Sequence, residues 1–398
     1  MNQFLNTGNY EECCGCSACV AICPISCIKM KETEEGFLYP IIEDMSKCLH
    51  CSLCAKVCPM EASREEKNDI TALAGYTKND DVIMNCSSGG IFPEIAKLFL
   101  EQSGVVYGAH LQNDHKLTHI EINNFEELEK ILGSKYIQSD MQDTFVRCKE
   151  RLEEGKNVLF SGTPCQIDGL YRFLHHEYQN LYTIDVICHG VPSQKMFDHY
   201  VSFLERKHKA KLMDINFRDK SRNGWSITLK YTMESKNGRK KNYYLLSPLS
   251  EYFSGFLGGY FMRESCYYCP YASLNRPGDI TLGDFWGYQK TRSDLKHDKG
   301  LSLLLINSDK GKELIEKLNK NHMFFDTISE ESIRMSENKN LYKPTYRPEC
   351  RNTIYLELCK DGFEVISQKY LRGNFTTRNR VKNMIPRKYL DKLRGIMK

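Results

Sequence analysis

The sequence predicts a protein of the mixed α+β and α/β classes, with a small cysteine-rich module, a mixed α/β region and a basic helical C-terminal tail. Three observations lead to this prediction. One cysteine spacing occurs twice in the first sixty residues, strand-like and helix-like segments alternate through the middle of the chain, and residues 371–398 carry nine Lys or Arg against one Asp. The expected divisions are residues 1–63, 70–175, 176–345 and 346–398.

The cysteine spacing of the first module is typical of proteins that hold two 4Fe-4S clusters. Each run reads C-x2-C-x2-C-x3-C-P, and the two runs start at Cys13 and Cys48. In such runs three cysteines wrap one cluster, while the fourth ligates the other cluster. We therefore predict a bacterial ferredoxin-like fold, with one cluster on Cys13, Cys16, Cys19 and Cys58 and the other on Cys48, Cys51, Cys54 and Cys23.

Two other chemistries use closely spaced cysteines. A disulfide framework needs an oxidising compartment, and structural zinc prefers two separated CxxC pairs. Neither explains two four-cysteine runs that each end in Cys-Pro. Cys14 and Cys27 lie inside the module but off the spacing, so we interpret them as small buried side chains.

Composition favours a cytoplasmic redox enzyme. The first residues contain no basic stretch followed by an apolar run, and no apolar segment approaches the roughly 18 residues of a membrane span. Eighteen cysteines without an export signal indicate metal ligation in a reducing compartment. We expect a cytoplasmic location, or a peripheral one at the inner membrane surface.

The region after a charged linker at residues 64–69 is expected to alternate strands and helices. Hydrophobic periodicity predicts helices over 91–102 and 143–154 and from 193, and strands over 105–107, 157–160, 181–187 and 280–282. Such alternation favours a mostly parallel sheet that is covered by helices. Residues 227–233 and 241–246, joined through Asn237-Gly238, predict a hairpin.

Four further cysteines lie at turns where a metal site can be built. Two of them follow predicted strands, at the end of a sheet where α/β proteins gather their sites, and the other two form a CxxC followed by Pro270. We predict a third 4Fe-4S cluster, with zinc or a redox-active CxxC as alternatives. The predicted ligands are Cys165, Cys188, Cys266 and Cys269, while the remaining thiols, Cys86, Cys148, Cys350 and Cys359, are interpreted as structural.

Several short stretches between residues 80 and 290 resemble the beta-subunit family of coenzyme F420-reducing hydrogenase and related dehydrogenases. They are CSSGG at 86–90, GSKY at 133–136, SGTPCQ at 161–166, CHGVPS at 188–193, FRDK at 217–220, the Cys266/Cys269 pair and GDFWG at 283–287. The resemblance implies FAD beside an iron–sulfur cluster. Members of that family act on a deazaflavin coenzyme, on chlorophyll precursors or on unknown substrates. The genes of bacterial members often accompany surface-polysaccharide genes.

A flavin would connect one-electron clusters to two-electron organic chemistry. There is no strand-following GxGxxG, so the dinucleotide fingerprint is absent from the sequence. The loop Ser87, Ser88, Gly89 and Gly90 precedes a predicted helix and is either a phosphate site or a plain helix cap. Further candidate flavin contacts are Lys135, Thr163 and Trp286. A solvated surface charge is the alternative for Lys135, and core packing is the alternative for Trp286.

Two residues are candidates for catalysis. His189 follows a predicted cluster ligand and would donate a proton near the flavin or hydrogen-bond a cluster sulfur. Arg218 lies on a basic loop that would suit an anionic substrate or the flavin diphosphate, or that is simply a charged surface loop.

Two function classes follow. The first is a self-contained iron–sulfur flavoenzyme that exchanges electrons between a donor or acceptor protein such as ferredoxin and an unknown organic substrate. The second is an electron-transfer subunit that docks on a larger hydrogenase or dehydrogenase. The basic tail from Pro386 would form an amphipathic helix that contacts an anionic membrane or packs on the protein itself. No nucleic-acid-binding motif accompanies its charge.

Overall fold

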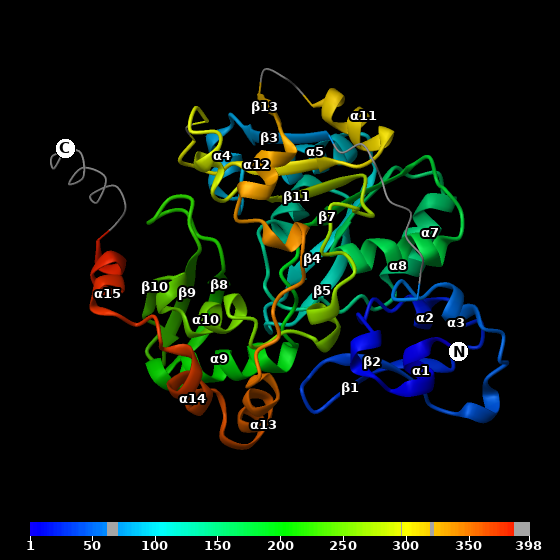
Figure 1. Ribbon diagram of the computed structural model, residues 1–398, viewed down its shortest axis with the longest axis horizontal. Coiled ribbons are helices and arrows are strands. Elements are labelled where there is room, and N and C mark those ends of the chain that lie inside the picture. The colour runs from blue at the N-terminus through cyan, green and yellow to red at the C-terminus, as the bar shows by residue number, and fades with distance from the viewer. Residues whose placement is uncertain (62–70, 296, 319–321, 386–398) are drawn as a thin grey trace.

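The computed structural model describes residues 1–61, 71–295, 297–318 and 322–385. The predicted linker at 64–69 and the predicted tail helix from Pro386 lie outside these ranges. The N-terminal module contains one two-stranded antiparallel sheet and three short helices (Figure 1). Its elements are α1 (Gln3–Thr7), α2 (Ala18–Ala21), β1 (Ile28–Glu32), β2 (Leu38–Ile42) and α3 (Leu53–Lys56).

The two cysteine runs have matching backbones. Gly15 and His50, each directly before the second cysteine of its run, have φ values of +71° and +50°. Ser17 and Ser52, each directly after that cysteine, have φ values of +68° and +60°. Left-handed residues around a cysteine turn successive N–H groups toward one side, as in anion-binding loops. The repeated spacing therefore folds into a repeated loop, which ends in α2 in one run and in α3 in the other.

A sheet of eight strands forms the centre of the α/β region, in the order β13-β3-β12-β11-β7-β6-β4-β5. Four central strands, β11, β7, β6 and β4, pair in parallel, while the remaining pairs are antiparallel. The prediction of a mostly parallel sheet was therefore wrong outside the centre, because β5 returns from β4 as a hairpin and three other strands add on antiparallel. The strands are β3 (Thr71–Thr77), β4 (Val105–Leu111), β5 (Leu117–Ile122), β6 (Val158–Gly162), β7 (Leu181–Val186), β11 (Ile280–Asp284), β12 (Ser302–Ile306) and β13 (Met323–Ile328).

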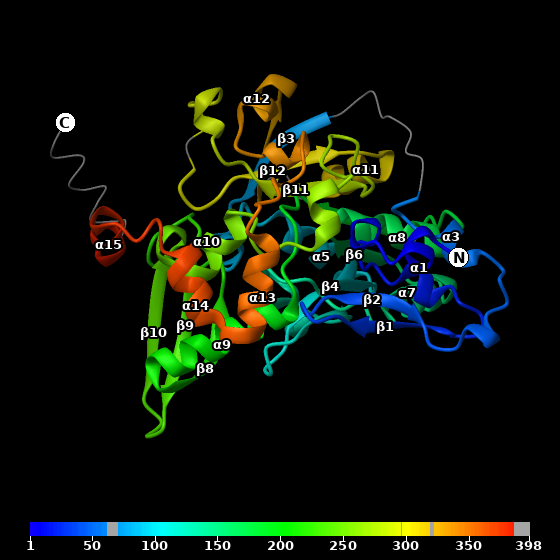
Figure 2. The same cartoon turned by 60° about the horizontal axis from the view of Figure 1, so that its bottom comes forward.

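Alternating apolar residues place helices on both faces of this sheet. Val106 and Leu159 pack on one face with α5 (Ile91–Glu101) and α11 (Asp309–Lys317). Their neighbours Val105 and Val158 pack on the other face. That face is covered by α7 (Thr144–Glu153) and α8 (Pro164–Leu174), and the N-terminal module packs against it as well (Figures 1 and 2).

The second half of the chain adds a three-stranded antiparallel sheet in the order β10-β9-β8, which confirms the predicted hairpin. Helices from the C-terminal part share its apolar core and close the lower left of the view in Figure 1. The strands are β8 (Ala210–Asn216), β9 (Thr228–Ser235) and β10 (Lys240–Leu246), and the helices of this part are α9 (Gln194–His208), α10 (Glu251–Leu257), α13 (Arg351–Asp361), α14 (Phe363–Ile366) and α15 (Thr377–Met384). Shorter helices are α4 (Asp80–Met84), α6 (Leu128–Ile131) and α12 (Glu330–Met335).

The N-terminal module docks on α8 through its first cysteine loop. Helix α2 packs against α8, and a Cβ added at Gly169 of α8 would lie 3.0 Å from the sulfur of Cys16. A glycine at this point lets the helix approach the loop more closely than any other residue would allow. The docking brings the first cysteine run beside the carboxyl ends of the central strands.

A buried ion pair supports the β7–β11 part of the sheet. The guanidinium of Arg276 lies 2.8 Å from the carboxylate of Asp185, and the two side chains are 1% and 0% exposed. We expect Arg276→Met to lower the free energy of unfolding by about 3–5 kcal/mol, because the Asp185 charge would stay buried without its cation. Arg334→Met, in the exposed pair Arg334–Glu330, should lower the free energy of unfolding by less than about 1 kcal/mol. Urea unfolding measures both losses, and equal losses would contradict the expectation.

Candidate functional site

The structure gathers five cysteines of the N-terminal module around one small cavity, and four of them are the predicted ligands of one cluster. Three of these four come from the first run and the fourth is the last cysteine of the second run, so the crossed arrangement appears in space. We call these residues the inner cysteine set, and all four are buried: Cys13, Cys16, Cys19 and Cys58. Burial raises the pKa of the Cys58 thiol to about 11, so the thiolates that clusters require depend on a bound cation.

A second small cavity collects the complementary cysteines, which we call the outer cysteine set: Cys48, Cys51, Cys54 and Cys23. This set lies nearer the surface, since Cys51 is exposed and Cys23 and Cys48 are half-buried. Cys27, predicted to be a packing residue, is buried but also lines this cavity, with its sulfur 3.6 Å from that of Cys23. The outer cavity therefore contains five thiols.

Cys14 and Met60 form the wall between the inner cavity and a much larger one. Both side chains line both cavities, and Cys14 is 8% exposed. The Cys14 thiol contacts Cys16 of the inner set on one side and Cys165 on the other. Cys14 was predicted only to be a buried side chain, and no pattern in the sequence indicated that it would separate two sites.

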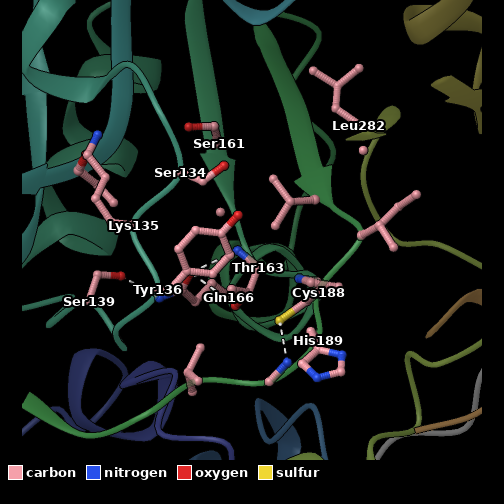
Figure 3. A pocket seen from close by; sticks show the side chains of 18 of the residues that line it. Ser134, Lys135, Tyr136, Ser139, Ser161, Thr163, Gln166, Cys188, His189 and Leu282 are labelled. Carbon is pink, nitrogen blue, oxygen red and sulfur yellow. Dashed lines mark hydrogen bonds between the residues drawn. The ribbon is translucent and has the colours of Figure 1, made fainter. Parts of the chain in front are cut away.

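The larger cavity has a volume of about 380 Å³ and lies at the carboxyl ends of the central parallel strands. Thr163 follows β6, Cys188 follows β7, and Asp284 ends β11, so all three strands deliver side chains to it. This is the place where open α/β sheets bind their ligands. Figure 3 shows the Tyr136 ring reaching toward the middle of this central cavity, between Lys135 and the Cys188–His189 segment.

All four cysteines predicted to hold a third cluster line the central cavity. We call Cys165, Cys188, Cys266 and Cys269 the cavity cysteines. Burial and the neighbouring Cys165 raise the pKa of the Cys188 thiol to about 12. Burial raises the pKa of the Cys266 thiol as well, and the other three cavity cysteines add to this increase. Four cysteines that line one cavity fit the ligand chemistry of a 4Fe-4S cluster.

No described cysteine forms a disulfide. Across the ranges that the structure describes, no group of three or more His, Cys, Asp or Glu side chains converges as it would around a single metal ion. A 4Fe-4S cube keeps its cysteine sulfurs farther apart than a single zinc ion does, so these two findings are compatible with clusters. The ligand assignments themselves stay predictions.

The loop Ser87–Gly90 leads into α5, and three of its four residues line the central cavity: Ser87, Ser88 and Gly90. Its carbonyl groups are held from behind by two buried cations. Arg218 donates to Ser87 O at 2.9 Å, and Lys220 donates to Ser88 O at 2.6 Å. Gly89 does not line the cavity, and its N–H donates to Ser302 Oγ at 2.9 Å.

Arg218 is buried, and its guanidinium is largely committed to other protein groups. It makes two hydrogen bonds to Asp284, at 2.6 and 3.0 Å, and one to Tyr136 Oη at 3.1 Å. Asp284 also accepts from Trp225 Nε1 at 2.6 Å. The interpretation of this loop as a charged surface segment is therefore wrong for Arg218, whose contacts shape the cavity wall.

Lys135 lines the cavity wall with its ammonium turned onto backbone carbonyls. Its Nζ donates to Ala109 O at 2.8 Å and to Leu132 O at 2.7 Å, and burial lowers its pKa to about 7. Thr163 caps α8, where its N–H donates to the side chain of Gln166 at 2.9 Å. Thr163 Oγ1 also lies 3.3 Å from the Cys165 sulfur.

His189 lies beside the cavity cysteines with one ring nitrogen engaged. Nδ1 lies 2.9 Å from Asn340 Oδ1, while Nε2 is buried and has no hydrogen-bond partner among the described residues. An unpartnered buried nitrogen in a ligand-sized cavity is expected to meet a ligand or water. A proton-donor role for His189 stays a prediction.

Trp286 does not line the central cavity in the structure. Its ring stacks on Trp225 with centroids 4.3 Å apart, and the guanidinium of Arg218 lies 5.3 Å from its centroid. Trp286 therefore packs against the protein core, which was the alternative to a flavin contact. Its influence on the cavity passes through Arg218.

Two family models match the chain. Residues 155–330 match the C terminus of the coenzyme F420 hydrogenase/dehydrogenase beta subunit, and residues 12–62 match a 4Fe-4S dicluster domain. Over residues 155–330 the chain is therefore similar to the beta subunit of coenzyme F420 hydrogenase and dehydrogenase. The two matches support an iron–sulfur protein related to an oxidoreductase family, with the dicluster domain ahead of the beta-subunit-like region.

A similar solved structure comes from a xenon-derivatization study of the F420-reducing [NiFe] hydrogenase complex of Methanosarcina barkeri. The match has 15% sequence identity and a TM-score of 0.43, and it covers 70% of this chain and 96% of the other. None of the curated proteins compared with the chain matches it. In the described part of the chain, no helix is both long and apolar enough to span a membrane.

We expect Gly89→Ala to destabilise the loop at the cavity regardless of what binds there. An added Cβ would lie 2.4 Å from Gly75 O and 2.9 Å from Ser302 N, and these backbone atoms have no room to move aside. Overpacking of this kind costs about 1–3 kcal/mol. Gly373→Ala is the matched control, because nothing lies within 4 Å of its Cβ position. A thermal midpoint that stays at the wild-type value in the Gly89 variant would argue against the tight packing.

Proposed function

We propose that this protein is an iron–sulfur flavoprotein oxidoreductase that moves electrons between a protein partner at the outer cysteine set and an organic substrate beside FAD in the central cavity. The observation that carries the proposal is the shared wall of Cys14 and Met60 between the inner and central cavities. Only two side chains therefore separate the inner cysteine set from the space that the cavity cysteines line. A flavin there would supply the exchange between one-electron and two-electron chemistry.

The exposure of the cysteines supports a path that begins or ends at the outer cysteine set. The outer set includes the exposed Cys51, whereas all members of the inner set are buried. Cys19 of the inner set packs in one apolar cluster with Cys54 of the outer set. A protein partner such as ferredoxin would thus dock at the outer set, and the inner set would lie between it and the cavity.

The loop Ser87–Gly90 offers backbone amides for a flavin phosphate, because among the described residues only the Gly89 N–H of this loop has a hydrogen-bond acceptor. In a trans peptide the carbonyl and the following N–H point in opposite directions. Because Arg218 holds Ser87 O, the Ser88 N–H faces away from that arginine, and no hydrogen bond to it is found among the described residues. The Gly89 N–H is already bound to Ser302. We therefore propose Ser88 N–H as one phosphate donor of this loop.

An electron-transfer subunit is the second candidate function. The exposed outer cysteine set favours it, because a protein partner can reach that set from solvent. A purified chain that binds flavin but oxidises or reduces nothing until a partner protein is added would support the subunit. Turnover of a donor and an acceptor by the purified chain would support the enzyme.

The substrate and the cellular role rest on the family resemblance alone. Reduction of a deazaflavin coenzyme and a role in surface-polysaccharide metabolism are both proposals of this kind. Membrane contact through the basic tail concerns residues outside those described. Equal liposome binding by the full chain and by a chain ending before Arg372 would contradict it.

Anaerobic purification with iron, sulfide and flavin counted per chain tests the proposed function directly. We expect about twelve irons and one FAD, because three sets of four cysteines would each hold four irons. About eight irons would restrict the clusters to the N-terminal module. A chain that takes up no flavin after reconstitution would contradict the flavoprotein.

We expect Cys188→Ala to lower the iron content by about four per chain, because it removes one thiolate of the cavity cysteines. Cys148→Ala is the control, since that thiol is fully buried in α7 and lines none of the three cavities. Iron analysis and the visible absorption of both variants give the result. An unchanged iron count in Cys188→Ala would exclude the third cluster.

The two neighbouring thiols of the outer cavity give a test of ligand identity. We expect Cys23→Ser to lose or convert the outer cluster, because the spacing assigns Cys23 as its fourth ligand. Cys27→Ser should retain all irons, although its sulfur lies only 3.6 Å away from that of Cys23. Electron paramagnetic resonance of both variants distinguishes the cases. If Cys27→Ser loses the cluster and Cys23→Ser keeps it, the assignment is reversed.

A further inference from the structure

Arg263 is a completely buried cation at the junction between the N-terminal module and the central cavity. Its side chain is 0% exposed. Nε donates to Cys13 O at 2.7 Å, and one terminal nitrogen donates to Leu38 O at 3.0 Å and lies 3.6 Å from the Cys13 sulfur. The other terminal nitrogen donates to Gln138 Oε1 at 3.0 Å. The guanidinium thus reaches the peptide and the thiol of an inner cysteine.

The other three buried arginines each have a carboxylate partner. Arg218 pairs with Asp284, Arg276 with Asp185, and Arg351 with Glu35. Among the described residues no Asp or Glu side chain lies within ion-pair distance of Arg263. A charge that is fully buried without a counterion is strongly destabilising, so the negative charge is expected to come from another source.

The neighbouring groups indicate what that source is. Arg263 stacks on the Tyr39 ring, with its central carbon 3.7 Å from the ring centroid, and Tyr39 stays neutral because burial raises its pKa. The remaining polar contacts of Arg263 are neutral carbonyls and an amide, apart from the Cys13 sulfur. Cys13 becomes a thiolate when it ligates iron, and a cluster with four thiolates carries net negative charge.

We propose that Arg263 is the counterion of the cluster held by the inner cysteine set and that it raises the reduction potential of this cluster. A one-electron reduction adds a negative charge to the cluster, and a fixed cation beside a ligand sulfur stabilises the reduced form more than the oxidised form. The proposal rests on the proposed cluster assignment, which iron counting in the wild-type chain tests separately.

The experiment compares reduction potentials of the iron-loaded full-length chain with Arg, Lys or Met at position 263. Anaerobic redox titration followed by electron paramagnetic resonance gives one potential for each cluster. In Arg263→Met we expect one potential to fall by at least a tenfold change in the reduction equilibrium, about 59 mV for one electron, while the other potentials stay constant. Arg263→Lys keeps the charge, so the reduction equilibrium constant of each cluster should stay within threefold of the wild-type value.

Each outcome decides the proposal. Unchanged potentials in an iron-replete Arg263→Met chain would overturn it, as would a fall of all potentials together. If the methionine variant loses four irons, the lysine variant decides: retention of all irons with a near-native potential supports a counterion. If the lysine variant keeps all its irons but the reduction equilibrium constant of the inner cluster falls tenfold, the charge at position 263 does not set the potential and the proposal is overturned.

Discussion

Two buried arginines determine where the N-terminal module lies, and the relation between the three cavities depends on that placement. Arg263 reaches from the loop that carries Cys266 to the backbone of Cys13 and Leu38. Arg351, from α13, pairs with Glu35 at 2.7 Å, beside the β1–β2 hairpin. Both contacts cross from the second half of the chain to its first forty residues. They keep Cys14 against Cys165, because moving the module away would break the hydrogen bonds of Arg263 to the module and the ion pair of Arg351.

The same constraint explains why glycines lie at the junction. Gly15 has a φ of +71°, and a Cβ there would lie 2.7 Å from the Arg263 guanidinium. On the other side, Gly169 allows α8 to approach Cys16. These close contacts hold the first cysteine run tightly between Arg263 and α8. A short separation between the two cavities favours electron transfer between sites that occupy them.

The parts of the fold that could be predicted from sequence are those with a local signal. The cysteine runs specify a loop geometry by themselves, and the hydrophobic periods of α5, α7, β6 and β7 could be read from which face is apolar. The antiparallel strands β12 and β13 could not be assigned in the same way, because their pairing with β3 joins residues more than 200 positions apart. Strand order of that kind depends on tertiary contacts that no short window contains.

The candidate site shows the same division. The positions of Cys165 and Cys188 after predicted strands brought them to one end of the sheet, since parallel strands share their carboxyl edge. Cys14 and Arg263 were not predicted to have a role, because their significance comes from contacts between segments about 150 and 250 residues apart. A signal for Arg263 did exist, since it lies three residues before Cys266, but the sequence does not show that its side chain turns away toward Cys13.

Burial and charge act in opposite directions on the inner cysteine set, and this opposition bears on the direction of electron flow. Removal of water disfavours the more negatively charged state of a cluster and thus lowers its reduction potential. The outer set, with Cys51 exposed, experiences less of this effect than the inner set. Burial alone would therefore make transfer from the outer to the inner set unfavourable. A fixed cation at Arg263 opposes that difference at the point where it arises, which would let electrons cross a buried site without a large energetic barrier between the surface and the central cavity.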